Sequence, residues 1–230
     1  MASQSSTPKV SSALAIYEKI REEILSLTMS PGAMIDEISI AKRFDVSRSP
    51  VREAFIRLAS DGLIKTLPNK NSQVAPLEIE DFPRYIDALD LVQRAVTRLA
   101  AIHHTAEDLA EIKNRNDLFK QAVETRDPLN MIDTNFEFHL AVSQASHNKY
   151  FTHMYTRLLN EGRRTLRIYY RSFNDNPPPQ MVGTHDDIIE AIEKRDAEVA
   201  DQLAHDHTIQ LSDGFINYLS KHFTTDMKFY

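Results

Sequence analysis

The stretch Val46-Ser47-Arg48-Ser49-Pro50-Val51-Arg52-Glu53-Ala54, followed by Asp61-Gly62-Leu63-Ile64, decides the fold of the N-terminal part of the chain. Ser49 and Pro50 form an N-cap and first-turn pair, which predicts a helix that begins at the proline. Gly62 is the left-handed residue expected just past the end of that helix. The predicted buried face of this helix consists of Val51, Ala54, Phe55 and Leu58.

The residues on either side complete a recognisable order of elements. Apolar spacing predicts a helix over 13–27 and a short helix over 37–44 before the quoted stretch. After it, two short β-prone runs at 63–67 and 73–75 flank a turn at 68–71. Three helices followed by a hairpin predict a winged helix-turn-helix over residues 11–77, after a disordered tail at 1–10.

Four polar residues lie at the exposed start of the third predicted helix: Ser47, Arg48, Ser49 and Arg52. A helix N-terminus carries the positive end of the helix dipole and unpaired N–H groups, which suit phosphates and base edges in a major groove. These residues are therefore candidate DNA contacts. The pattern alone also fits an ordinary solvent-exposed helix, because single surface arginines are common.

Beyond Pro76-Leu77 the pattern changes to long helices, which predict an antiparallel all-helical bundle over 78–230 and make the protein mainly α. Residues 1–77 carry 10 Lys/Arg against 8 Asp/Glu, whereas residues 78–230 carry 17 against 25. A mildly basic head on an acidic body is typical of a nucleic-acid-binding domain joined to a domain of another function. The six predicted helices lie near 79–103, 106–125, 128–146, 148–173, 179–194 and 196–222.

The composition excludes several classes of protein. There is no cysteine, which rules out disulfide scaffolds, iron–sulfur sites and thiol catalysis. Only 5 glycines argue against sheet-rich folds and Gly-rich phosphate loops. We see no signal peptide and no apolar run near the roughly 20 residues of a membrane helix, so we expect a cytoplasmic protein without membrane association.

All nine histidines lie in the second predicted domain, and three of them fall on inward-facing positions. His139 follows Asn135 by one helical turn, His185 begins an apolar face of three isoleucines, and His207 ends an apolar face of a valine and a leucine. Three imidazoles and an oxygen ligand suit Zn²⁺ or a similar divalent ion, with positions left for water or a small anion. Taken alone, a histidine on an apolar face is more often a hydrogen-bonded core residue than a metal ligand.

The segment V-S-R-S-P-V-R-E-A with the later D-G-L-I resembles the DNA-binding motif of the GntR family of bacterial transcription regulators, over about residues 12–77. The resemblance implies that Arg48 and Arg52 contact double-stranded DNA most directly, helped by Ser47 and Ser49. It also implies that the hairpin tip near Lys70 reaches the minor groove. The pattern departs from the family at Ile38, Asp45 and Asn71, where a basic residue and two glycines are usual.

The second domain resembles the FCD effector domain of the FadR-like branch, in its VanR-like six-helix form. The pair His185 and His207, 22 residues apart, matches a family pattern, and His139 matches a histidine that follows a carboxylate by four residues. That resemblance implies a bound divalent metal, most often Zn and also Ni or Mn. Asn135 stands where the carboxylate is usual, so we predict a weaker site or one that recruits water or the effector.

The same resemblance implies a small organic acid as effector. Arg163 and Arg167, one turn apart on the fourth helix of this domain, are candidates to hold its anionic group, although a solvated cationic face explains them equally well. An arginine frequent in the family is replaced by Leu89. Tyr169 and Tyr170 are interpreted as packing residues.

These observations favour a metabolite-responsive transcription repressor that binds a palindromic operator as a homodimer. One alternative is an all-helical metalloenzyme with a three-His zinc site, but no motif such as H-E-x-x-H supplies a general base, so we predict no enzymatic activity. Another alternative is a DNA-binding module whose second domain only dimerises and whose histidines are structural.

Overall fold

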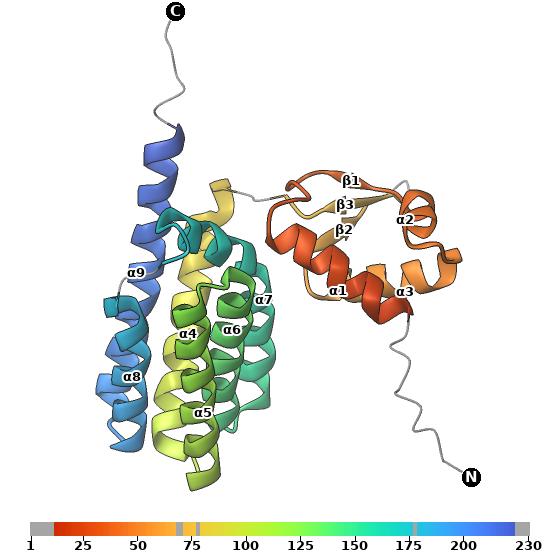
Figure 1. Ribbon diagram of the computed structural model, residues 1–230. Helices are drawn as coiled ribbons and strands as arrows, with labels where there is room; N and C mark the ends of the chain where they lie inside the picture. Colours follow the sequence, from red (N-terminus) through yellow and green to blue (C-terminus); the bar gives the residue numbers. More distant parts are fainter. Residues whose placement is uncertain (1–11, 68–70, 77–78, 177–178, 224–230) are drawn as a thin grey trace, which may run out of the picture. The chain divides into compact units, whose positions relative to one another are not determined.

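The computed structural model describes residues 12–67, 71–76, 79–176 and 179–223 (Figure 1). The chain is divided into two compact units, with the boundary between Leu77 and Glu78. The first contains three helices and a small sheet, and the second is helical. The predicted tail at 1–10 lies outside the described residues.

The first unit is built on helices α1 (Ser12–Leu25), α2 (Glu37–Phe44) and α3 (Arg48–Ser60). The Asp36 carboxylate accepts a hydrogen bond from the Ser39 amide and caps α2. Asp45 takes a left-handed conformation with φ of 52° at the end of α2, which turns the chain into α3. Ile16, Ile20, Val51 and Leu58 are among the buried side chains where α1 packs on α3.

Helix α3 begins at Arg48, two residues before the predicted start at Pro50. Ser47 takes the N-cap place, with extended backbone angles and no side-chain capping bond. Pro50 is tolerated inside the first turn because the N–H groups there have no intrahelical acceptor. The predicted Ser49-Pro50 cap is therefore wrong, and Ser49 is a helical residue. Gly62 has a φ of 70°, as predicted.

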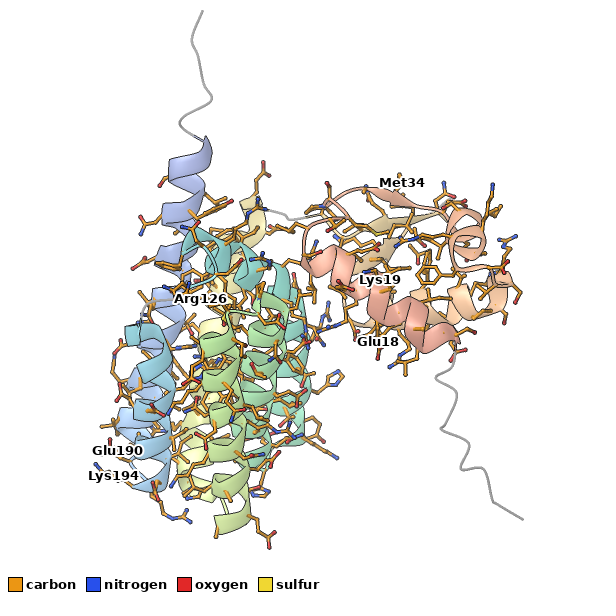
Figure 2. All side chains as sticks on the ribbon, in the orientation of Figure 1. Glu18, Lys19, Met34, Arg126, Glu190 and Lys194 are labelled. Atoms are coloured by element: carbon orange, nitrogen blue, oxygen red, sulfur yellow. The ribbon has the colours of Figure 1, made fainter. Side chains whose placement is uncertain are left out.

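The sheet of the first unit has three strands: β1 (Met34–Ile35), β2 (Ile64–Thr66) and β3 (Ser72–Val74). They lie in the order β1-β3-β2, antiparallel throughout. Strand β1 was not predicted from sequence, because two residues are too few to show an alternating pattern. Met34 projects outward from this strand and is 56% exposed (Figure 2).

The second unit is a bundle of six α helices within the described residues. Helix α4 packs against α6, α7, α8 and α9, so it forms the centre of the bundle (Figure 1). No helix in the described ranges is long and apolar enough to cross a bilayer. After a 3-10 turn at Ile79–Asp81, the helices are α4 (Phe82–His103), α5 (Ala106–Thr125), α6 (Pro128–Ala145), α7 (Lys149–Ser172), α8 (Pro179–Glu193) and α9 (Ala197–Phe223).

Local signals fix the ends of these helices. Thr105 and Asp108 form a reciprocal capping box at the start of α5. Asp127 and Asn148 accept backbone hydrogen bonds at the starts of α6 and α7. Arg126 takes a left-handed conformation with φ of 54° after α5 (Figure 2). The mainly α architecture predicted from the sequence is confirmed.

Two apolar clusters fill the bundle. One gathers Phe138, Val142, Ile188 and Ile192 with alanines from α4, α6, α8 and α9. The other gathers Phe119, Ile132, Tyr169 and Tyr170 from α5, α6 and α7. The candidate site of this unit lies between the two clusters. The centroid of the His185 ring is 3.9 Å from that of Phe138 in the first cluster, on which it stacks, and 4.8 Å from that of Phe119 in the second.

Candidate functional site

The first unit presents two exposed arginines at the start of α3. The side chains of Arg48 and Arg52 are 53% and 58% exposed, and both donate to one carboxylate oxygen of Glu37, at 2.9 and 3.0 Å. Burial opposes ionisation of Glu37, but the hydrogen bonds from the two arginines outweigh it and lower the pKa of this carboxyl. A single carboxylate on α2 thus sets the position of both guanidinium groups.

Of the other predicted DNA contacts, two lie at the exposed start of α3 and one falls outside the described residues. Ser47 and Ser49 are exposed beside Arg48 at the same end of α3. Ile38, in the first turn of α2, is 60% exposed. Lys70, the predicted contact of the hairpin tip, lies outside the described residues.

We expect Glu37→Gln to raise the affinity for an unrelated DNA duplex a few-fold. The substitution removes a negative charge beside the predicted DNA contacts and frees both arginines. Exposed ion pairs of this kind are worth about 0–1 kcal/mol. Fluorescence anisotropy at several salt concentrations measures the change. Unchanged affinity and an unchanged salt slope contradict a role for Glu37 in holding the arginines.

In the second unit, His139 of α6, His185 of α8 and His207 of α9 meet in the interior. One ligand nitrogen from each lies within 4.8 Å of the other two, and all three pairs of ring centroids are 5.1 Å apart. His139 and His185 are buried, and His207 is partly exposed. The structure therefore brings together the three histidines that the sequence singled out.

A hydrogen-bonded chain fixes the tautomer of His185. Its Nδ1 lies 3.3 Å from the Asn116 carbonyl oxygen, while the Asn116 amide group donates to Asp186 at 2.7 Å. Lys120 donates to the same Asp186 oxygen at 2.7 Å. Because an amide oxygen only accepts, His185 Nδ1 carries the hydrogen and Nε2 keeps its lone pair for a metal.

The other two histidines are also held in forms that bind cations. His207 Nδ1 lies 3.1 Å from the Thr184 hydroxyl, which leaves Nε2 available. Burial lowers the pKa of His207 to about 4. Burial, together with the neighbouring histidines, holds the pKa of His139 and His185 well below 6.5. Neutral imidazoles are the form that coordinates a metal.

The three histidines fit a divalent metal of the zinc type. On one tetrahedral zinc with bonds of about 2.0–2.1 Å, ligand nitrogens lie about 3.4 Å apart. The rings must therefore draw together slightly from their 4.8 Å spread. Asn135 lies one turn before His139 and is 9% exposed. Its oxygen is thus a candidate fourth ligand or a partner for one.

The histidines lie on the wall of a cavity of about 660 Å³, counting its open mouth. Of the described residues that line it, only Arg163 is charged. Arg163 is 10% exposed, donates to Asp133 at 2.5 Å and lies 4.0 Å from the Phe136 ring centroid. The polar lining residues other than these histidines and Arg163 are Tyr85, Gln93, Asn135, Tyr169, Tyr170 and Gln210.

The structure does not bring Arg167 into this cavity. Its guanidinium pairs with Asp175 at 2.6 Å, beyond the end of α7, and Arg167 is absent from the described lining. Arg163 and Arg167 are four residues apart and therefore lie on the same side of α7. The cavity borders this side at Arg163 but does not extend to Arg167. Arg163 alone keeps the predicted place beside the histidines.

Several cavity residues were missed from sequence. Gln93 donates to the Ala204 carbonyl at 3.0 Å and accepts from Tyr155 at 2.9 Å, which joins α4, α7 and α9. Gly162 permits a close approach of α4, because a Cβ there would lie 2.1 Å from the Tyr85 hydroxyl. These contacts join residues far apart in the chain, which no local sequence pattern indicates.

Comparisons with known proteins agree with this division of the chain. The family described as "Bacterial regulatory proteins, gntR family" matches residues 12–74, and the FCD domain family matches residues 85–210. The chain is 28% identical over 199 residues to the HTH-type transcriptional repressor RspR of Escherichia coli, covering 86% of each. It is 27% identical to a probable D-xylose utilization operon transcriptional repressor of Paenarthrobacter nicotinovorans, covering 80% of each. Among solved structures, E. coli McbR/YncC shares the fold with a TM-score of 0.74 at 21% identity, over 91% of this chain and 100% of that one.

Proposed function

Because the chain belongs to the GntR family of bacterial transcription regulators, with an FCD domain after its winged helix-turn-helix, we propose that it is a metabolite-responsive repressor. The family and the named relatives are regulators of transcription, so the metalloenzyme alternative is set aside. The cavity that joins three neutral histidines to a single arginine carries the proposal. This cavity is a potential anion site in the helical second domain, whereas the DNA-binding motif lies in the first domain.

We propose that the protein binds a palindromic operator as a homodimer. One recognition helix reads one half-site, so two copies related by a two-fold axis read both halves. Arg48 and Arg52 reach base edges in the major groove, while Ser47 and Ser49 bind phosphates at the start of α3. We also propose that Lys70 contacts the minor groove.

His139, His185 and His207 would hold a divalent ion, Zn²⁺ before Ni²⁺ or Mn²⁺, with Asn135 as an oxygen ligand. The bound ion supplies a Lewis-acidic anchor for a carboxylate. Arg163 provides the second positive group for the same anion, and the apolar wall excludes water around it. A small organic acid is therefore the effector class that the cavity suits.

Effector binding changes operator affinity only if the acid prefers one arrangement of the chain over another. The cavity is lined by residues of α4 to α9. One of them, Tyr85 of α4, donates a hydrogen bond to the Leu158 carbonyl of α7 at 3.2 Å. Ligand-driven closure of these helices is the step that we expect to alter the spacing of the two DNA-binding heads.

The test begins with genomic fragments selected by the metal-loaded protein, from which the operator is identified. Anisotropy titrations then measure operator affinity with and without each member of a panel of small carboxylates. We expect at least one acid to weaken operator binding tenfold or more in the wild type, but less than twofold in His139→Ala. If operator binding is tight and no acid changes it, the second domain serves dimerisation alone.

We also expect Asn135→Asp to raise zinc affinity about tenfold or more, because a carboxylate is a stronger zinc ligand than an amide oxygen. Competition with a chromogenic chelator measures the dissociation constant. Asn130→Asp is the matched control, since Asn130 is an exposed residue of the same helix and gains the same charge. Equal effects of the two substitutions would place residue 135 outside the metal site.

A further inference from the structure

Tyr170 of α7 is a buried polar residue that the site described above does not use. Its side chain is 0% exposed, and its hydroxyl forms no hydrogen bond with any residue that the structure describes. Burial raises the pKa of Tyr170 far above 10, so the phenol keeps its hydrogen. A buried O–H without an acceptor is costly, and such groups are usually paired.

The Tyr170 side chain lies on the wall of the same cavity as the histidines. Arg163, Leu166 and Tyr170 follow each other along one face of α7 and all line the cavity. Seven residues of helix separate Arg163 from Tyr170, a distance of about 10 Å along the axis. The cavity lining therefore spans about two turns of α7.

The part of the cavity around Tyr170 is apolar. Tyr170 packs in one cluster with Phe119 and Ile132, and Leu166 and Leu211 pack against that cluster. All of these residues also line the cavity. Phe119 joins this lobe to the metal site, because its ring lies 4.8 Å from that of His185. A ligand anchored at the histidines would thus meet an apolar wall before it reaches Tyr170.

We propose that the effector has three parts: a carboxylate at the histidines and Arg163, an apolar body, and an oxygen acceptor that receives a hydrogen bond from Tyr170. This inference rests on the proposed organic-acid function and narrows its ligand class. Simple two- or three-carbon acids have no apolar body that would separate the carboxylate from a distant oxygen acceptor. Leu89 adds a further apolar side chain to the cavity lining.

A purely structural role for the hydroxyl gives a different expectation. The other buried polar atom without a partner in the described residues is Arg167 Nε, one turn earlier on α7. If a permanent water joined these two groups, Tyr170→Phe would destabilise the acid-free protein. If the hydroxyl waits for a ligand, the same substitution removes an unpaired group and leaves the melting temperature unchanged or raised.

Tyr155→Phe is the matched control. Tyr155 is equally buried on the same helix and lies outside the cavity lining, but its hydroxyl donates to Gln93 at 2.9 Å. We expect this variant to melt several degrees below the wild type, because Gln93 loses a buried partner. Calorimetry compares the melting temperatures of the wild type, Tyr170→Phe and Tyr155→Phe, each loaded with metal and free of acid. If Tyr170→Phe lowers the melting temperature as much as Tyr155→Phe does, the proposal is overturned.

Matched acids test the ligand class directly. In each pair a CH₂ group becomes C=O, as in hexanoate with 5-oxohexanoate and 4-ethylbenzoate with 4-acetylbenzoate. Isothermal titration of the metal-loaded protein should show, for at least one pair, that the keto acid binds about 5–10-fold tighter. The ratio should fall to about one in Tyr170→Phe and persist in Tyr155→Phe.

The outcomes separate this inference from the function on which it rests. Acids that bind with no keto preference, or a preference that survives in Tyr170→Phe, overturn the role of Tyr170 and leave the organic-acid effector standing. If no acid of a broad panel binds the metal-loaded protein, the organic-acid proposal itself fails, and this inference fails with it.

Discussion

Replacement of Arg52 by alanine is expected to weaken operator binding on the order of 100-fold or more. A bidentate arginine contact with a base is worth about 1–3 kcal/mol, and a homodimer loses two of them. Affinity for unrelated DNA should fall far less, so the ratio of specific to non-specific binding drops. Anisotropy with the operator and with a scrambled duplex measures both.

Arg57→Ala is the control for this prediction. Arg57 is on the same helix, but its guanidinium lies 4.5 Å from the ring centroid of Tyr17 on α1, so it packs within the unit. We expect its operator affinity to stay within about threefold of the wild type. Equal losses for the two variants would mean that Arg52 acts through stability or overall charge rather than through base contact.

His207→Gln is expected to lower zinc affinity at least 100-fold and to abolish the response of operator binding to the effector. Changes in the residues that merely orient metal ligands already cost about 10–100-fold, and this change removes a ligand. Glutamine keeps a polar group near Thr184, so the bundle should still fold. Chelator competition gives the metal affinity, and anisotropy gives the effector response.

The neighbouring histidine provides the comparison. His205 lies two residues earlier on α9 and contacts Asp90 at 2.8 Å, away from the three-histidine group. His205→Gln should keep both the zinc affinity and the effector response. An unchanged zinc affinity in His207→Gln would remove His207 from the metal site and with it the reading of the cavity as an effector site.

The helical framework could be predicted because local signals agree with tertiary packing. Thr105 and Asp127, for example, begin helices where the sequence predicts them, since their side chains cap the first turn regardless of the neighbouring helices. The start of α3 was misplaced because Pro50 fits either the first or the third position of a helix. Strand β1 depends on its pairing of Met34 and Ile35 with β3, which no local pattern reveals.

The candidate site was predictable only in part. His139, His185 and His207 stood out because each lies on an apolar helix face, and such faces meet in a bundle interior. Asn116 was missed, since nothing near it in sequence indicates that it meets His185 across 69 residues. Tyr170 was interpreted as packing because an aromatic residue on a buried face normally packs, and only the three-dimensional arrangement shows its hydroxyl without a partner.

The most direct test of the account is the metal content of the full chain, purified without an affinity tag or chelator and measured by elemental mass spectrometry. A His185→Ala/His207→Ala variant, prepared in parallel and checked for its helical content, is the reference. The account predicts close to one divalent ion per chain, zinc first and nickel or manganese next, and almost none in the variant. No metal in the wild type, or equal metal in both proteins, would contradict the claim that these histidines hold the ion that anchors the effector.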